Sequence, residues 1–491
     1  MQNMISNRLF SYGKPLSRWL NRGKTPYIFT LVYIVVCATL VYINSRSLPA
    51  FLLLMASAGF IYYLKMKPAF KLGLGLFLAV LVIPILGVRN ISYLEVIFQI
   101  SVFAALALGL NIVVGFAGLL DLGYVAFYAV GAYTWAIFGS QQMYLLHEIP
   151  GTAPPHTPFF LPADMFYLFF FIGIGMAALT GILLGLPVLR LGGDYLAIVT
   201  LGFGEVIRVL ANNLDKPLNL TNGPQGITPV QRPMMPEPLL NGLRVVLDPL
   251  VGHSVTKGEF YNLFFYLLAL IVVVVVIIIT LRLDDSKIGR AWTAIREDET
   301  AAIAMGVPLV RLKVAAFAAG ASFAGAMGVL FAANRTFVSP ESFSFMQSIG
   351  VLTMVILGGL GSIPGVILGA AVVIILNLQV LQGLSLFLSQ LRQSSAVIPI
   401  INFAWRDLST QLDPAKYQRM LFGLILILMM IYRPAGLIPA ARRKRELTQE
   451  EEDLSPDPFP KGKGNLESLP PSGGSRRGVP AQENGKEQGE R

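Results

Sequence analysis

The stretch GLNIVVGFAGLLDLGYVAFYAVGAY, residues 109–133, contains one charged residue, Asp121, and five glycines. Asp121 is preceded by 25 uncharged residues back to Glu95 and followed by 26 up to Glu148. Each flank is long enough for one helix across a hydrocarbon core of about 30 Å. The stretch therefore predicts two membrane spans that meet near Asp121.

The rest of the chain has the same apolar character. Hydrophobic residues make up 54% and charged residues 13% of the 491 positions, whereas about 25% of residues are charged in soluble domains. This composition predicts an all-α, polytopic transmembrane helical bundle of about 10–12 spans. We expect the segments 27–45, 49–64, 71–88, 91–116, 122–139, 165–189, 195–211, 261–282, 314–333, 347–360, 363–380 and 418–432. Of these, 195–211 and 347–360 are short or polar enough to be partial or re-entrant.

The net charge of +10 is distributed in a way that predicts orientation rather than nucleic-acid binding. Basic residues precede the first span, lie at Lys65, Lys67 and Lys71, and follow the last span at 442–445. Lysine and arginine near span ends favour the cytoplasmic side. Alternating spans then place these clusters, Arg190, the loop 282–313 and both termini inside, with 140–164 and 212–260 outside. Contact with lipid headgroups accounts for the excess positive charge.

Three parts can be separated along the chain. Residues 1–90 form an N-terminal extension with three expected transmembrane helices, and residues 91–433 carry the polar and glycine-rich features. Residues 434–491 are rich in proline, glycine and charge, so we expect a disordered cytoplasmic tail.

Small residues recur every fourth position in three of the spans: Gly173, Ala177, Gly181 and Gly185; Gly320, Ala324 and Gly328; Gly361, Gly365 and Gly369. In a membrane this spacing predicts close helix contacts. The glycine-rich stretches 109–131 and 356–369 are also candidates for corresponding places in two halves of a transporter repeat.

Motifs of enzyme chemistry are lacking. The three histidines, His147, His156 and His253, show no metal-ligand spacing, and Cys37 is the only cysteine. The sequence has no HExxH motif, nucleophile elbow or Walker A motif. We therefore expect no catalytic site, metal or cofactor, and no nucleotide hydrolysis by this chain itself.

The loop 284–313 is the most informative connection. Residues from Arg290 to Met305 have helical character, and Gly306 and Pro308 are expected to end the helix. A solvated connector is one interpretation. A short helix that docks in a groove of another protein is the other.

This segment resembles the coupling helix of ATP-binding-cassette importer permeases, whose motif is Glu-Ala-Ala, three residues and then Gly. Ala301, Ala302 and Gly306 match, but Glu299 lies one residue early and Thr300 takes its place. Together with residues 109–133, 189–213, 220–227 and 337–362, the segment makes residues 91–433 similar to the LivM-type permease subunit of branched-chain amino acid importers. Gly192 departs from the family, which often has arginine there.

The resemblance implies a subunit that moves leucine, isoleucine and valine across a bacterial inner membrane. It implies as partners two ATPase subunits that hydrolyse the ATP, a second homologous permease, a periplasmic substrate-binding protein and membrane lipids. The alternatives are a related permease for urea or another small polar solute, and a stand-alone secondary transporter. The residues expected to couple to the ATPases are Gly289, Arg290, Arg296, Glu297, Glu299, Ala301, Ala302 and Gly306.

Polar residues inside the spans are candidates for a translocation path or gate, and each has a structural alternative. Glu205 and Arg208 lie three apart and could form an ion pair. Asp194, which precedes Tyr195, could cap a helix. Asn111 could hydrogen-bond across helices, and Thr221 and Asn222 could belong to an ordinary turn.

Asp121 has two interpretations of its own. In the first, it lies at the inner membrane edge in a tight connection between two helices, with Gly118 and Gly123 permitting the turn. In the second, the helix is broken and Asp121 lines the substrate path with the freed backbone.

Overall fold

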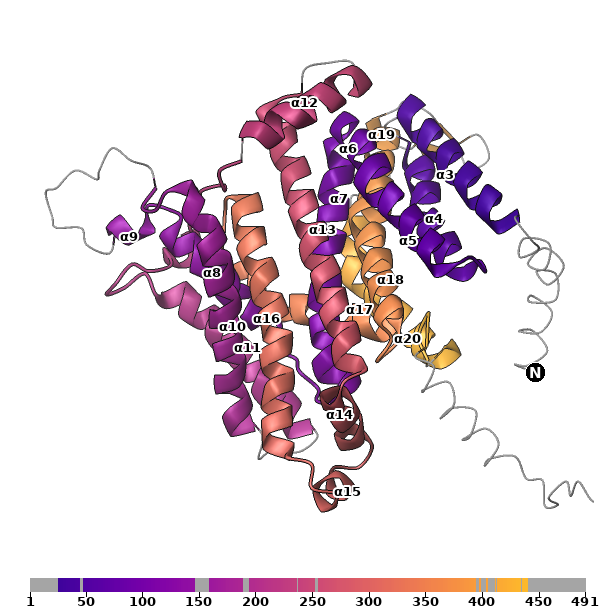
Figure 1. Cartoon of the computed structure of the whole chain (residues 1–491). Helices are drawn as coiled ribbons and strands as arrows, with labels where there is room; N and C mark the ends of the chain where they lie inside the picture. Colours follow the sequence, from indigo (N-terminus) through magenta and orange to yellow (C-terminus); the bar gives the residue numbers. More distant parts are fainter. Residues whose placement is uncertain are drawn as a thin grey trace, which may run out of the picture. The chain divides into compact units, whose positions relative to one another are not determined.

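The computed structural model of the chain describes residues 25–439, with gaps at 45–46, 146–158, 189–193, 236, 252–254, 394–396, 399–402, 405–410, 412 and 434. Arg190, Gly192, the three histidines, the basic run 442–445 and most of the predicted tail lie outside the described residues. The described residues form a bundle of α-helices (Figure 1).

The first half of the bundle runs from α3 to α11. Helices α3 (Thr25–Ile43) and α4 (Leu48–Tyr63) are followed by α5 (Pro68–Leu76), η1 (Phe77–Val82) and α6 (Ile83–Arg89), which are continuous. Helix α7 (Ile91–Leu110) continues into the π-helical η2 (Asn111–Phe116). Then come α8 (Val125–Phe138), α9 (Gln142–Leu145), η3 (Ala163–Met165), α10 (Phe166–Val188) and α11 (Asp194–Asn213).

The second half begins with η4 (Gly223–Gln225), α12 (Glu237–Val251) and α13 (Lys257–Asp284). Two short helices, α14 (Lys287–Glu297) and α15 (Glu299–Ala304), connect α13 to α16 (Leu309–Arg335). The chain continues with η5 (Pro340–Phe343), α17 (Phe345–Gly358), α18 (Ile363–Ile375), η6 (Leu376–Leu381) and α19 (Gln382–Gln393). A small antiparallel pair, β1 (Val397–Ile398) and β2 (Phe403–Ala404), precedes η9 (Pro414–Tyr417) and α20 (Gln418–Tyr432).

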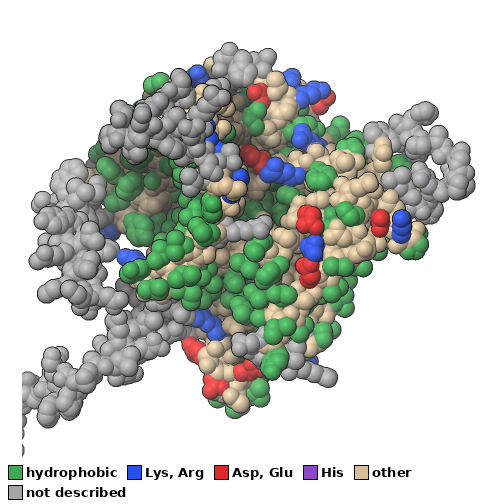
Figure 2. Space-filling view, turned by 180° about the vertical axis from the view of Figure 1, so that it is seen from behind, with side chains coloured by type: hydrophobic (Ala, Val, Ile, Leu, Met, Phe, Trp, Pro, Cys, Tyr) green, Lys and Arg blue, Asp and Glu red, His purple; other side chains and the backbone are tan. Residues whose placement is uncertain are grey.

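The predicted membrane bundle is confirmed. Within the described residues, nine helices are long and apolar enough to cross a membrane, and three shorter apolar helices account for the other predicted segments. Seen from behind, the molecule presents a broad region of hydrophobic side chains in which charged ones are sparse (Figure 2). Such a surface is suited to lipid rather than to water.

Two segments differ in length from their predicted bounds. The segment 195–211, which is short or polar enough to be partial or re-entrant, belongs to a 20-residue helix, α11. The segment 122–139, expected to be a full span, begins only at Val125 and gives the 14-residue helix α8. Residues 117–124 before α8 are not helical, which is why this segment falls short.

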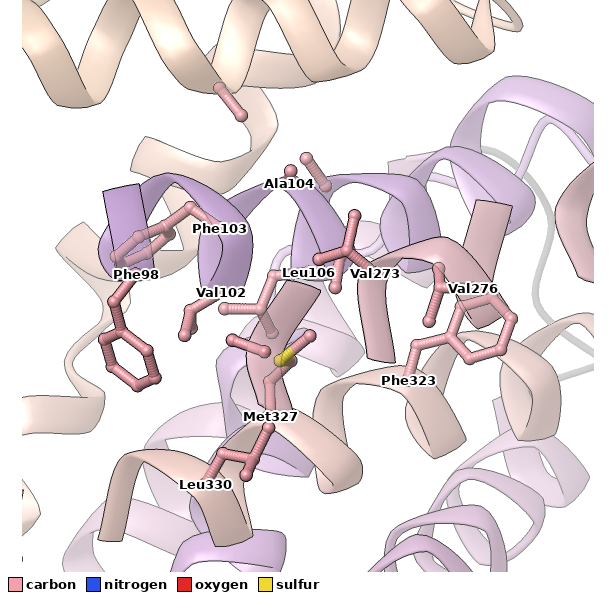
Figure 3. Packing of buried hydrophobic residues seen from close by; sticks show 14 of the residues in the cluster. Phe98, Val102, Phe103, Ala104, Leu106, Val273, Val276, Phe323, Met327 and Leu330 are labelled. Atoms are coloured by element: carbon pink, nitrogen blue, oxygen red, sulfur yellow. The ribbon is translucent and has the colours of Figure 1, made fainter. Parts of the chain in front are cut away.

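The centre of the bundle is formed by α7, α13 and α16. Phe98, Val102 and Leu106 of α7 face Val273 and Val276 of α13 and Phe323, Met327 and Leu330 of α16 (Figure 3). Helix α7 is the most enclosed span, with 89% of its apolar window buried. Because lipid tails are as apolar as these side chains, such contacts stabilise the bundle through van der Waals packing.

Small residues permit a close approach between α10 and α16. A Cβ atom added to Gly325 would lie 2.4 Å from the Ala177 Cβ and 2.7 Å from the Gly173 carbonyl oxygen. The predicted row on α10 is therefore a contact face. The row on α16 meets other helices, since a Cβ on Gly320 would lie 2.8 Å from the Gly109 carbonyl oxygen.

Candidate coupling site and membrane interior

The connection between α13 and α16 forms two helices rather than the one expected from Arg290 to Met305. Ser286 caps α14, its Oγ accepting a hydrogen bond from the Gly289 amide at 3.1 Å. Asp298 then takes an extended backbone, with φ −152° and ψ 108°, and caps α15 by accepting from the Ala301 amide at 3.0 Å. An aspartate that captures a backbone N–H in this way ends one helix and starts the next. Gly306, with φ 81°, ends α15, as predicted.

The environment of Asp298 also changes its protonation. The Ala301 amide and the Thr300 hydroxyl, which donates at 2.7 Å, hold the pKa of the Asp298 carboxyl below its ordinary value. The cap is therefore charged at neutral pH, next to the positive end of the α15 dipole.

One face of α14 is fixed to the bundle. Trp292 is fully buried, and its indole N–H donates to the Leu312 carbonyl oxygen at 2.7 Å. Gly289 lies so close to the end of α13 that an added Cβ would be 2.2 Å from the Leu283 carbonyl oxygen. These contacts make α14 a rigid extension of α13 and α16.

Arg296 links α14 to the stretch around Asp121. Its Nη1 donates to the Gly115 carbonyl oxygen at 2.6 Å, and an added Cβ on Gly118 would lie 2.7 Å from the Arg296 Cγ. Arg296, expected among the coupling residues, thus points into the bundle.

Glu299 fixes α15 to α16 through an ion pair. Its Oε1 accepts from the Lys313 Nζ at 2.8 Å, and Lys313 is only 3% exposed. A buried ammonium is costly unless it is paired, so this ion pair ties α15 to α16. The sequence did not predict this partner, because Lys313 lies 14 residues after Glu299 and beyond the turn at Gly306.

Exposed apolar side chains lie on α15 and at the start of α16. Met305 is 84% exposed, and Ile303 and Val310 are each about half exposed. Of the other predicted coupling residues, Ala302 is buried, whereas Arg290, Glu297, Ala301 and Gly306 are exposed. The end of the bundle at α15 thus combines a buried anchor with an exposed apolar surface.

The stretch that contains Asp121 is enclosed by protein. Asp121 is 1% exposed, and its Oδ1 accepts from the Gly123 amide at 2.9 Å. Gly118 makes the expected turn with φ 71°. Gly123 instead allows close packing, because an added Cβ would lie 1.9 Å from the Thr200 carbonyl oxygen. Asp121 lies in a buried, non-helical connection between two helices, and both interpretations of its role stay predictions.

Asn111 joins the two glycine-rich stretches. It is fully buried, and its Oδ1 accepts from the Gly361 amide at 2.9 Å. Asn111 thus makes a hydrogen bond to the turn between α17 and α18, close to the structural alternative, and its place in a path stays a prediction. The two stretches considered as parts of a repeat lie against each other at this point.

Two short helices begin inside the bundle. Helices α8 and α17 have 14 residues each, about 21 Å at 1.5 Å per residue, short of a core of about 30 Å. Helix α17 reaches the length of a span only together with η5, which precedes it. The Tyr124 hydroxyl, at the start of α8, donates to Gly320 near the middle of α16 at 2.7 Å. The Val125 amide donates to Ser348 Oγ in the first turn of α17 at 3.2 Å. The N-termini of α8 and α17 therefore meet within the bundle, α8 after a non-helical segment and α17 directly after η5.

Glu205 and Arg208 of α11 form the expected ion pair. Arg208 Nε donates to Glu205 Oε1 at 3.0 Å, and Nη1 donates to Glu341 of η5 at 3.0 Å. The Arg208 side chain is 24% exposed. This cluster connects α11 to the segment that leads into α17.

The remaining candidates lie at the ends of α11. Tyr195 is 70% exposed, and the side chain of Asp194 lies outside the described residues. The Thr221 hydroxyl donates to the Ala211 carbonyl oxygen at 2.7 Å. Asn222 has φ 58°, and its side-chain amide donates to Gly226 at 2.8 Å. Thr221 and Asn222 thus stabilise a turn.

The comparison with known sequences agrees with this architecture. Residues 92–430 match the family described as "Branched-chain amino acid transport system / permease component". The chain belongs to this family. The match begins at the start of α7 and ends within α20, so it includes α14, α15 and both short helices.

Individual relatives support the assignment. The chain is 38% identical over 370 residues to the "High-affinity branched-chain amino acid transport system permease protein LivM" of Escherichia coli, covering 74% of this chain and 72% of the relative. A probable LivM of Methanocaldococcus jannaschii is 24% identical and covered over 92% of its length. The LivH permease of Escherichia coli is 26% identical over 160 residues, 33% of this chain and 42% of the relative. No solved structure matches this chain.

Proposed function

We propose that this chain is the membrane permease subunit of an importer that moves leucine, isoleucine and valine across a bacterial inner membrane. Family membership over residues 92–430 is the observation that carries the proposal. The identity of 38% to a permease named for branched-chain amino acid transport supports this substrate class.

The partners follow from the same resemblance. Two ATPase subunits hydrolyse ATP, a periplasmic binding protein delivers the amino acid, and membrane lipids surround the spans. The second permease resembles this chain, as the relationship to LivH permeases suggests. The end that carries α14 and α15 faces the cytoplasm together with both termini, and the segment 212–260 faces outward.

Coupling to ATP hydrolysis runs through the end of the bundle that carries α14 and α15. The exposed side chains of Met305, Ile303 and Val310 form the contact with an ATPase subunit. Movement of α14 is transmitted by Arg296 to Gly115 and so to the non-helical segment before α8. That segment leads to the place where α8 and α17 meet, which supports a mechanical link from the cytoplasmic end to the interior.

Reconstitution of the complete importer in lipid vesicles tests the proposal. With ATP and the binding protein, we expect uptake of labelled leucine, isoleucine and valine. Uptake of urea instead of these amino acids would favour a related permease for small polar solutes. Uptake by this chain alone, driven by an ion gradient without the ATPases, would identify a secondary transporter and overturn the proposal.

A further inference from the structure

A half-open cavity of about 740 Å³ lies between the helices beside the N-terminus of α17. Its lining comes from α7, α8, α16, η5, α17, α18 with η6, and α20, and none of the described lining residues carries a charge. Gln99 lines it eight residues after the start of α7, which is about 12 Å along the helix. The cavity therefore opens into the half of the bundle remote from α14 and α15.

Four carboxamide side chains converge on this cavity from four different elements. They are Gln99 of α7, Gln347 of α17, Asn377 of η6 and Gln418 of α20. Gln99 donates to Glu95 at 3.1 Å. The other three side chains are each partly exposed, and among the described residues no side-chain hydrogen bond holds them to the protein. An apolar occupant would remove these amides from water without giving them a hydrogen-bond partner, which is costly, so a polar occupant of the cavity is favoured.

The chemistry of the lining specifies that occupant. Each carboxamide offers two N–H donors and a carbonyl acceptor, so the group can satisfy both a carboxylate and an ammonium. Charged lining residues, which would favour an ion of one sign, are lacking among those described. Phe331 and Phe422 supply apolar walls against which an aliphatic side chain can pack. The volume falls in the range of about 300–1,000 Å³ that is usual for small-molecule sites.

We infer that this cavity binds the transported amino acid as a zwitterion, with its charged groups on the carboxamides and its side chain against the phenylalanines. The inference rests on the proposed function and adds a location within this one chain. The amino acid reaches the cavity from the end of the bundle opposite α14 and α15. A lipid acyl chain is disfavoured as the occupant because it would leave three amides unsatisfied.

Protection of introduced cysteines tests the site in the assembled importer. Cys37 is the only native cysteine, so Cys37→Ser provides a background without thiols in this chain. Asn377→Cys and Gln418→Cys place a thiol in the cavity. Gln382→Cys is the matched control, because Gln382 is exposed, lies five residues after Asn377 and does not line the cavity. The rate of modification by a small methanethiosulfonate reagent is measured with and without leucine.

Leucine at ten times its dissociation constant is expected to slow modification at 377 and 418 by about elevenfold and to leave position 382 unchanged. Valine and isoleucine should protect, whereas lysine and glutamate at the same concentration should not. Equal rates with and without leucine, or protection only by added phosphatidylglycerol, would overturn the site. Because two cavity positions are tested, the result does not depend on the assembly of a single variant. Leucine uptake by the same vesicles tests the proposed function separately, since parental uptake without protection refutes only the cavity.

Discussion

Gly123 is packed so closely against α11 that the structure has no room for a side chain there. Gly123→Ala would bring a Cβ to within 1.9 Å of the Thr200 carbonyl oxygen, a backbone atom that cannot swing aside. We expect the variant to lose about 1–3 kcal/mol or more of stability, seen as a lower thermal unfolding midpoint of the purified chain. Gly175→Ala is the control, because nothing lies within 4 Å of an added Cβ there. A destabilised control, or an unchanged Gly123→Ala, would contradict the packing.

Asp121 is predicted to act through its hydrogen bond rather than its charge. Asp121→Asn keeps a carbonyl oxygen for the Gly123 amide, so we expect folding and leucine uptake near the parental level. Asp121→Ala leaves that buried amide without its acceptor, at a cost of about 1–3 kcal/mol, and should lower both stability and uptake. Uptake is measured in vesicles with equal amounts of assembled importer. Loss of uptake in a stably folded Asp121→Asn variant would instead assign the charge a place in the path.

At the scale of elements, Arg296 is predicted to connect α14 with the interior. Arg296→Ala removes the bond to Gly115 and the contact with Gly118. We expect ATP hydrolysis to continue while the leucine moved per ATP falls severalfold. Arg311→Ala is the control, since Arg311 is exposed at the same end of the bundle. If both variants keep the parental ratio of transport to hydrolysis, Arg296 does not transmit movement.

The apolar tip beyond α14 is predicted to bind the ATPase. Met305→Glu adds a charge to a side chain that is 84% exposed, so folding should be unaffected. Burial of that charge in an interface is costly, and recovery of the ATPase with the purified permease should drop. Val245→Glu, on α12 and 77% exposed, is the matched control. Equal recovery of the ATPase with both variants would place the docking surface elsewhere.

The elements could be predicted from the sequence only where hydropathy determines them. Long apolar runs gave α3, α7, α10 and α13, because a span must be apolar over its whole length. The break at Asp298 and the short α8 depend on local hydrogen bonds and on neighbours that are distant in sequence. The bonds from Asn111 to Gly361 and from Arg296 to Gly115 join residues 250 and 181 apart. No periodicity predicts such pairs. The grouping of carboxamides around the cavity could not be predicted either, because they lie singly on four elements.

At the scale of the whole molecule, the proposed functional parts lie within residues 91–433. Specific contacts join the described part of the N-terminal extension to them. Phe51 stacks on Tyr93 with ring centroids 4.2 Å apart, and the Tyr266 hydroxyl donates to the Ala79 carbonyl oxygen at 2.6 Å. Matching residues 92–430 to the family leaves α3 to α6 outside the matched region. The extension is therefore expected to support the bundle without taking part in transport.

Deletion of an even number of spans tests this division. Removing residues 2–64 deletes α3 and α4 but keeps Lys65, Lys67 and Lys71, whose charge favours the cytoplasmic side. We expect this shortened chain to keep its orientation and leucine uptake, with a lower unfolding temperature because the Phe51–Tyr93 stack is lost. Removing residues 2–89 deletes three spans, an odd number, so α7 would have to enter the membrane from the opposite side. That chain should fail to assemble, as measured by alkylation of a cysteine placed in the 212–235 loop. Loss of uptake by a correctly oriented 2–64 deletion would show that the extension takes part in transport.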